Sequence, residues 1–173
     1  MTDAPTVKLV PVDRSHLEAL AALTDDPLVL RYTRVPEPVP AAFAEDWLAF
    51  YEAGRRDGTS EAFALLDAVG TFLGIGVAPR IDAAARTAEL GYVVVREARG
   101  RGIASRALRL LTEWGFAELG ALRLELYISV ENEASKAVAR RAGYAREGVM
   151  RSVHVKQGRR EDVELWSRLP SDP

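Results

Sequence analysis

The sequence predicts a mixed α/β fold, in which a central, mostly antiparallel sheet carries helices on both faces. Three observations predict it. Apolar runs typical of strands alternate with amphipathic helical runs along the whole chain. Short turns, at Val69-Gly70 and at residues 156–159, join two pairs of strands as hairpins. A strand at residues 86–95, a helix and a strand at residues 122–130 follow one another in the order of a parallel crossover.

Caps and prolines define the N-terminal elements. Residues 7–12 are an expected strand, and the capping-box pattern Ser15-His16-Leu17-Glu18 opens a helix that runs to about residue 24. Asp25-Asp26-Pro27 ends this helix. Prolines in residues 35–40 exclude a helix interior or a central strand, because proline lacks the N–H donor. We therefore expect an extended loop there, and a helix over residues 41–55.

The central elements are a hairpin, a third strand and a crossover helix. The hairpin strands are residues 61–67 and 71–78, and residues 86–95 add the third strand. The next helix has apolar side chains at helical spacing and charged side chains outside. The apolar set is Ile103, Ala107, Leu110, Leu111 and Trp114, and the charged set is Arg106, Arg109 and Glu113.

The last elements complete the sheet. Alternate side chains of residues 122–130 are aliphatic, so this strand has one apolar face and one polar face. A helix at about residues 133–142 follows. Two strands, at about residues 144–155 and 161–169, then form the C-terminal hairpin.

Length and composition limit the class of protein. The chain has 173 residues, 48% of them hydrophobic, so residues 1–173 are expected to form one domain with a sizeable core. Cysteine is absent, and His16 and His154 are too far apart in sequence to suggest a zinc cluster, so no metal is expected. A net charge of −2 argues against nucleic acid as the main partner.

Hydropathy and the start of the chain predict a cytoplasmic protein with no membrane partner. No run of about 18 apolar residues is present. Residues 1–5, Met-Thr-Asp-Ala-Pro, lack the basic and apolar regions of a signal peptide. Unpaired edges of the expected sheet would allow a homodimer.

Glycines join the strand at residues 86–95 to the following helix and create a potential anion site. The segment reads Arg99-Gly100-Arg101-Gly102-Ile103-Ala104. The first amides of a helix have no intrahelical partner, and the glycines lack the Cβ atoms that would keep a phosphate away. A pyrophosphate would fit on these N–H groups. The alternative is an ordinary tight turn with solvated arginines.

The spacing of this segment excludes two familiar phosphate loops. A P-loop closes with Gly-Lys-Ser/Thr, which does not follow Gly102, and the dinucleotide fingerprint needs a glycine where Ser105 stands. What remains, Arg99-x-x-Gly102-x-Ala104, resembles the Arg/Gln-x-x-Gly-x-Gly/Ala signature of the GNAT acyltransferase superfamily. In that superfamily the loop and the following helix hold the pyrophosphate of acetyl-CoA.

A second set of motifs resembles the same superfamily. Asn132-Glu133-Ala134-Ser135 opens a helical run that ends at Arg141-Ala142-Gly143-Tyr144, and Glu147-Gly148 follows. With Gly158 ahead of Asp162-Val163, these motifs resemble the branch that includes the ribosomal-protein N-terminal acetyltransferases. The resemblance covers roughly residues 86–169 and implies the GNAT fold.

The resemblance implies transfer of an acetyl group from acetyl-CoA to a primary amine through a ternary complex, without a covalent enzyme intermediate and without a metal. Such an attack needs a base to deprotonate the amine, an acid to protonate the thiolate and donors to hold the oxyanion. A non-catalytic acyl-CoA sensor, and the same chemistry with another acyl-CoA, stay open as alternatives. The acceptor also stays open among protein N-termini, aminoglycoside-like antibiotics, amino acids and polyamines.

The resemblance assigns the general acid to Ser135. The superfamily's commonest acid is a Tyr seven residues after the helix-opening Asn, and Ala139 stands there in this chain. The ribosomal branch carries instead a Ser at the position of Ser135. A first-turn Ser bonded to the backbone, and an N-cap role for Asn132, are the structural alternatives.

Three residues are candidates for the general base. His154 lies where some members of the branch carry a catalytic Glu, and its reference pKa of about 6.5 suits proton removal near neutrality. Glu89 begins the strand before the glycine loop, where many superfamily enzymes carry a Glu that acts through water. Glu125 is third, on the polar face of residues 122–130, where an exposed charge needs no function. Each of the three is otherwise a structural side chain.

The resemblance also assigns the remaining contacts. In the family the strand is splayed from its neighbour, so that backbone groups of Val93, Val94 and Val95 bind the pantetheine amides; a β-branched core strand is the alternative. Arg31-Tyr32-Thr33 lies where the branch usually builds its acceptor pocket. The implied cofactor-binding set adds Arg99, Gly100, Arg101, Gly102, Ile103, Ala104, Asn132 and Ser135.

Overall fold

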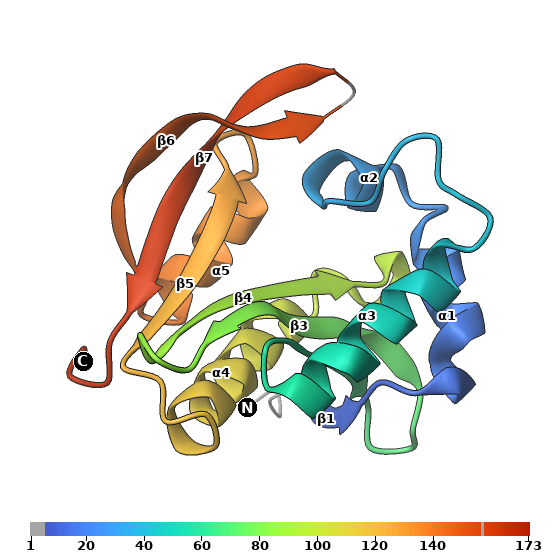
Figure 1. The fold of residues 1–173 in the computed structure, drawn as a ribbon, viewed down its shortest axis with the longest axis horizontal. Coiled ribbons are helices and arrows are strands. Elements are labelled where there is room, and N and C mark those ends of the chain that lie inside the picture. Colours follow the sequence, from blue (N-terminus) through green and yellow to red (C-terminus); the bar gives the residue numbers. More distant parts are fainter. Residues whose placement is uncertain (1–5, 157) are drawn as a thin grey trace.

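A computed structural model describes residues 6–156 and 158–173. Residues 1–5, which the sequence analysis searched for a signal peptide, and Gln157, which was expected in a turn, lie outside the described part. Its strands form one seven-stranded sheet in the order β1-β2-β3-β4-β5-β7-β6 (Figure 1). Neighbouring strands are antiparallel except β4 and β5, which are parallel. The strands are β1 (Lys8–Pro11), β2 (Glu61–Leu66), β3 (Phe72–Asp82), β4 (Thr87–Val94), β5 (Arg123–Ser129), β6 (Ala145–Lys156) and β7 (Arg159–Arg168).

Helices cover both faces of this sheet, as the sequence predicts (Figure 1). On one face, α1 (Leu17–Leu23) and α3 (Phe43–Asp57) pack with residues of β2 and β3 in one apolar cluster. On the other face, α4 (Ile103–Ala117) and α5 (Glu133–Arg141) pack over β4 and β5, around the fully buried Leu108, Leu111 and Leu124. The predicted mixed, mostly antiparallel sheet with a crossover helix is confirmed.

The N-terminal helices differ from the prediction at two places. Asp13, not Ser15, supplies the capping box, and it caps a short 3₁₀ turn, η1 (Arg14–His16), that precedes α1. Asp25-Asp26-Pro27 ends α1 as expected, but the same residues open α2 (Pro27–Tyr32), which the sequence analysis did not predict. The Asp26 carboxylate accepts a hydrogen bond from the Leu28 N–H at 2.9 Å, and proline fits the first position of a helix.

Strands β4 and β5 separate beyond a short paired segment, and this opening positions the site. Their parallel register includes only Thr87 with Arg123, Ala88 with Leu124 and Glu89 with Glu125. Strand β4 continues to Val94 beside β3, while β5 continues to Ser129 beside β7. Figure 1 shows the two strands diverging toward α2 and the β6–β7 hairpin. A second 3₁₀ turn, η2 (Arg96–Ala98), then leads from β4 to the glycine loop.

No helix within residues 6–156 and 158–173 is long and apolar enough to cross a membrane. No group of three or more His, Cys, Asp or Glu side chains among them is placed to hold a metal ion.

Candidate active site

The glycine loop turns the chain sharply into α4. Gly102 is the N-cap residue of α4 with a φ of 79°, and Gly100 has a φ of 73°. Such positive φ angles strain any residue with a Cβ, which explains glycine at both places. An ideal Cβ built on Gly100 meets no atom within 4 Å, so the surface beside the loop is open. Ile103 is 2% exposed and anchors the first turn of α4 in the core.

Arg99 braces the loop against α2. Its Nη2 lies 2.6 Å from Asp26 Oδ2, and its Nε donates a hydrogen bond to the Val94 carbonyl at 3.0 Å. Asp26 also caps α2, so the loop and α2 share one carboxylate. The side chain of Arg101 is exposed beside the loop. Of the two arginines, Arg99 therefore has the structural contacts and Arg101 points to solvent.

The main chain of β4 has one edge on β3 and the other on the opening. Val95 donates its N–H to the Leu73 carbonyl of the β3 side at 3.0 Å. Because bonding direction alternates along an antiparallel strand, Val93 also turns its peptide groups toward β3, whereas Val94 turns its groups to the opening. The Val94 carbonyl accepts the hydrogen bond from Arg99. Of the three valines, Val94 therefore has the main-chain N–H that faces the opening.

Ser135 and Asn132 meet at the first turn of α5. The Asn132 side chain accepts a hydrogen bond from the Ser135 N–H at 3.1 Å, so Asn132 is the N-cap of this helix. The hydroxyl of Ser135 is engaged elsewhere: its Oγ lies 2.9 Å from the hydroxyl of Tyr92 on β4. Burial raises the pKa of Tyr92 to about 12. Tyr92 was not predicted as a site residue, because an aromatic residue ahead of three valines is typical of a core strand.

Glu89 lies on the opposite face of β4, under two arginines. Its side chain is 10% exposed, and its Oε1 accepts a hydrogen bond from Arg34 Nη2 at 2.6 Å. Arg80 reaches within 3.8 Å of both Glu89 and its cross-strand neighbour Glu125. Arg34, which follows α2, was not predicted as a site residue because no motif surrounds it.

Glu125 is buried, which contradicts the expectation of an exposed position on the polar face of its strand. Its side chain is 12% exposed, and its two oxygens accept hydrogen bonds from Arg123 Nε at 2.6 Å and from the Tyr127 hydroxyl at 2.9 Å. The expectation was wrong because Arg123 and Tyr127 bond its two oxygens, and Arg80, from β3, lies 3.8 Å away with its guanidinium over the Tyr127 ring. With both oxygens engaged, Glu125 is the least available of the three base candidates.

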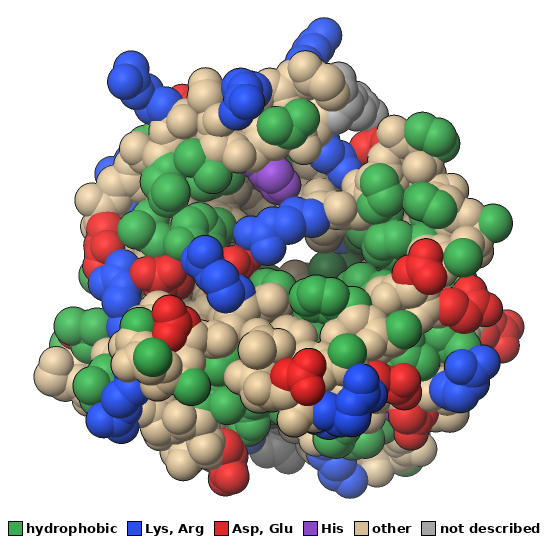
Figure 2. All heavy atoms as spheres, in the orientation of Figure 1, with side chains coloured by type: hydrophobic (Ala, Val, Ile, Leu, Met, Phe, Trp, Pro, Cys, Tyr) green, Lys and Arg blue, Asp and Glu red, His purple; other side chains and the backbone are tan. Residues whose placement is uncertain are grey.

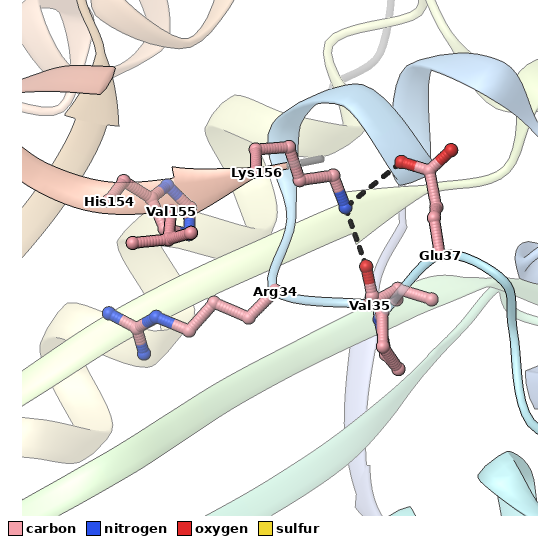
Figure 3. Close-up of a pocket in the computed structure, with 7 residues that line it drawn as sticks. Arg34, Val35, Glu37, His154, Val155 and Lys156 are labelled. Atoms are coloured by element: carbon pink, nitrogen blue, oxygen red, sulfur yellow. Dashed lines mark hydrogen bonds and ion pairs between the residues drawn. The ribbon is translucent and has the colours of Figure 1, made fainter. Parts of the chain in front are cut away.

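His154 lines a cavity of about 340 Å³ beside the β6–β7 hairpin (Figure 3). Burial lowers the pKa of His154, and the nearby charges of Arg34 and Lys156 lower it further against the opposing effect of Glu161 and Glu89. At neutral pH the imidazole is therefore unprotonated and able to accept a proton. The lining residues are Arg34, Val35, Pro36, Glu37, His154, Val155 and Lys156.

The cavity wall is held together by charged contacts. Lys156 donates a hydrogen bond to the Val35 carbonyl at 2.5 Å and lies 3.3 Å from Glu37 (Figure 3). Its burial at 8% exposure makes it part of the wall rather than a mobile surface cation. Figure 2 shows that this face of the molecule is hollowed, with Lys and Arg side chains around the opening.

The segment Arg31-Tyr32-Thr33 lies at the end of α2, beside a second cavity of about 310 Å³ that Arg31 lines. Arg31 donates two hydrogen bonds to Glu161 of β7, at 2.8 and 2.9 Å, and also bonds Glu131 at 2.5 Å. The Thr33 carbonyl accepts a hydrogen bond from Lys156 at 3.3 Å. The structure thus brings this segment and the β6–β7 hairpin together, as an acceptor pocket would require.

These contacts divide the candidate residues between the two sides of β4. Ser135 and Tyr92 lie on the side of α4 and α5. Glu89 lies on the side of α3 with Arg34, whose charge also acts on His154. The opening between β4 and β5 joins the two sides. A thioester placed in this opening would have a hydroxyl donor on one side and two proton acceptors on the other.

Comparison with known proteins identifies the family. Residues 6–145 match the model of the acetyltransferase (GNAT) domain. A spermidine N(1)-acetyltransferase of Escherichia coli K12 is 29% identical over 154 residues, which are 86% of this chain and 77% of that protein. A putative ribosomal N-acetyltransferase of Bacillus subtilis is 35% identical over 100 residues, or 58% of this chain and 55% of that protein.

Solved structures share the fold. A spermidine N-acetyltransferase of Vibrio cholerae, in complex with CoA and spermine, has a TM-score of 0.85 at 22% identity and covers 96% of this chain and 97% of its own. A ribosomal L7/L12 α-N-protein acetyltransferase in complex with coenzyme A has a TM-score of 0.86 at 24% identity, with 95% and 94% covered.

Proposed function

The chain belongs to the GNAT family of acetyltransferases, and we propose that it transfers the acetyl group of acetyl-CoA directly to a primary amine in a ternary complex. It is an acyl-CoA-dependent N-acetyltransferase, as its relatives are. The observation that carries the ternary mechanism is the opening between β4 and β5, with Ser135 on one side and Glu89 on the other. Such an arrangement lets an amine add to the face of the thioester carbonyl beside a proton acceptor, while a hydroxyl donor lies on the other side of the opening.

Each candidate residue has one task in this proposal. The amine nitrogen bonds to the thioester carbon while His154 or Glu89 takes a proton from the amine, and Ser135 gives its proton to the sulfur as the carbon–sulfur bond breaks. Exchange with solvent water then returns a proton to Ser135 and removes the proton from the base. The N-terminal amides of α4, from Ile103 onward, hold the pyrophosphate, and the Val94 main chain binds the pantetheine arm. Arg99 stabilises the glycine loop through its hydrogen bond to Asp26. Asn132 positions Ser135 by accepting its N–H at the start of α5.

Release of CoA in the presence of an amine panel tests this proposal. Spermidine and peptides with a free N-terminal amine come first, because relatives of this chain act on spermidine and on ribosomal proteins. We expect CoA release with acetyl-CoA that depends on at least one amine and stops when that amine is omitted.

Tight binding of acetyl-CoA without release of CoA for any amine would favour an acyl-CoA sensor instead. Faster release of CoA from a longer or acidic acyl-CoA than from acetyl-CoA would identify that acyl-CoA as the acyl donor. The cytoplasmic location and the homodimer stay predictions.

Substituting Gly102 with valine should weaken acetyl-CoA binding by roughly 100-fold, since a β-branched side chain at a φ of 79° distorts the loop and blocks close approach of the phosphates. Calorimetric titration measures the affinity. Gly58→Val is the matched control, because Gly58 has a φ of 71° with open space around it and caps α3. Equal affinity in wild type and Gly102→Val, with both folded, would remove the pyrophosphate assignment.

A further inference from the structure

Tyr92 lies beside the opening on β4, beyond Glu89, the last residue paired with β5. Its ring packs on the core cluster between the sheet and helices α4 and α5. Its hydroxyl lies 2.9 Å from Ser135 Oγ, where either atom can be the donor. The hydrogen bond therefore joins a partly buried phenol on the sheet to the candidate acid on α5.

The direction of this hydrogen bond decides whether Ser135 can act. A hydroxyl has a single proton to donate. If Ser135 donates to Tyr92, the Ser135 proton is engaged in that hydrogen bond and is not directed at the sulfur. If Tyr92 donates to Ser135, the Ser135 proton is free to point elsewhere. A leaving thiolate only accepts hydrogen bonds, so its arrival selects the second arrangement.

Tyr92 is a dependable donor that does not itself lose a proton. Burial raises its pKa to about 12, so the phenol stays protonated throughout the neutral range. A hydroxyl that accepts one hydrogen bond becomes a better donor for the next, because bonds in a chain polarise one another.

We propose that Tyr92 is a positioning residue for catalysis, which donates its hydroxyl hydrogen bond to Ser135 and directs the Ser135 proton toward the leaving sulfur. The proposal rests on the role of Ser135 in the proposed function. Tyr92 keeps its proton and bonds neither the donor nor the acceptor.

The Tyr92→Phe variant tests the proposal, because it keeps the ring and its packing and removes only the hydroxyl. We expect the single-turnover rate of acetyl transfer, with the best amine of the panel, to fall about tenfold, as for one lost hydrogen bond. The affinity for acetyl-CoA should stay unchanged. In the Ser135→Ala background, Tyr92→Phe should not lower the transfer rate further, since Tyr92 affects the rate only by bonding the Ser135 hydroxyl.

Tyr144→Phe is the matched control. The Tyr144 hydroxyl also bonds a hydroxyl in the same core cluster, that of Thr112 at 2.8 Å, and burial likewise raises its pKa to about 12. Tyr144→Phe should leave the transfer rate unchanged, and thermal melting confirms that each variant is folded.

Two results would overturn the role of Tyr92 while leaving the proposed function intact. One is an equal loss in the wild-type and Ser135→Ala backgrounds, which would mean that Tyr92 acts through the fold. The other is an unchanged transfer rate in Tyr92→Phe when Ser135→Ala is slow. An unchanged rate in Ser135→Ala itself would overturn both the acid assignment and the role of Tyr92, with amine-dependent CoA release still intact.

Discussion

Replacing Ser135 with alanine should lower kcat by roughly 100-fold or more and leave the affinity for acetyl-CoA nearly intact. The physical reason is that a general acid acts only as the carbon–sulfur bond breaks, when the sulfur gains charge. The hydroxyl contributes little to ground-state binding, and the Ser135 N–H that Asn132 caps is unchanged by the substitution. Steady-state rates with saturating amine, together with calorimetric titration of acetyl-CoA, measure the two quantities.

The Asn132→Ala variant separates catalysis from helix capping. It removes the acceptor for the Ser135 N–H and should lower the free energy of unfolding by about 1 kcal/mol. Ser135→Ala leaves that hydrogen bond in place and should change stability less. If Ser135→Ala instead lost binding and turnover by the same factor, Ser135 would position the cofactor rather than donate a proton.

Regular elements were predictable because their signals are local. The alternation that runs from Leu122 to Val130 predicted β5, and its residues Leu124, Leu126 and Ile128 are at most 5% exposed. Leu122, at 50% exposure, stands before β5 begins and lies outside the core. The hairpins followed from turn residues in the same way. A pattern with a period of two or 3.6 residues needs no knowledge of distant segments.

Helix α2 was not predictable by the same reasoning. Asp-Pro ends one helix because proline cannot continue it, and begins another because proline suits its first position. The sequence around Asp26 satisfies both readings, and α2 spans only Pro27–Tyr32, too short for a clear periodic pattern. Its capping carboxylate is held by Arg99, far away in the chain.

The candidate site was predictable residue by residue but not as an arrangement. Motifs pointed to Ser135, Glu89 and His154 singly. The contacts that define their surroundings join residues far apart in sequence, such as Arg34 with Glu89, separated by 55 positions, and Tyr92 with Ser135, separated by 43. Glu125 shows the same limit, because one of its charged neighbours, Arg80, comes from another strand.

The general base should be revealed by the pH dependence of kcat/KM for the amine, measured for wild type, His154→Gln and Glu89→Gln. A protonated base is inactive, so activity should fall as the pH drops through the pKa of the base. This fall of activity forms the acidic limb of the pH profile. Burial and the charges of Arg34 and Lys156 lower the pKa of His154, so a limb that belongs to His154 should lie below the ordinary histidine value of about 6.5. The limb should correspond to one proton.

The acceptor amine also loses activity when protonated, and this effect must be separated from the enzyme. Two acceptors whose amines have different pKa values make the distinction. A limb that belongs to the amine moves with the acceptor, whereas a limb that belongs to the enzyme stays at the same pH for both.

If His154 is the base, the fixed limb should vanish in His154→Gln, with activity falling by roughly 100-fold, because glutamine cannot accept the proton. Glu89→Gln should keep the limb, and should move it to still lower pH, because removing the carboxylate leaves Arg34 unbalanced beside the imidazole. The reverse pattern, with the limb lost only in Glu89→Gln, would assign the base to Glu89 acting through water. A fixed limb that survives in both variants would reject both residues, and would leave Glu125 or bulk water to accept the proton, despite the two hydrogen bonds that already engage Glu125.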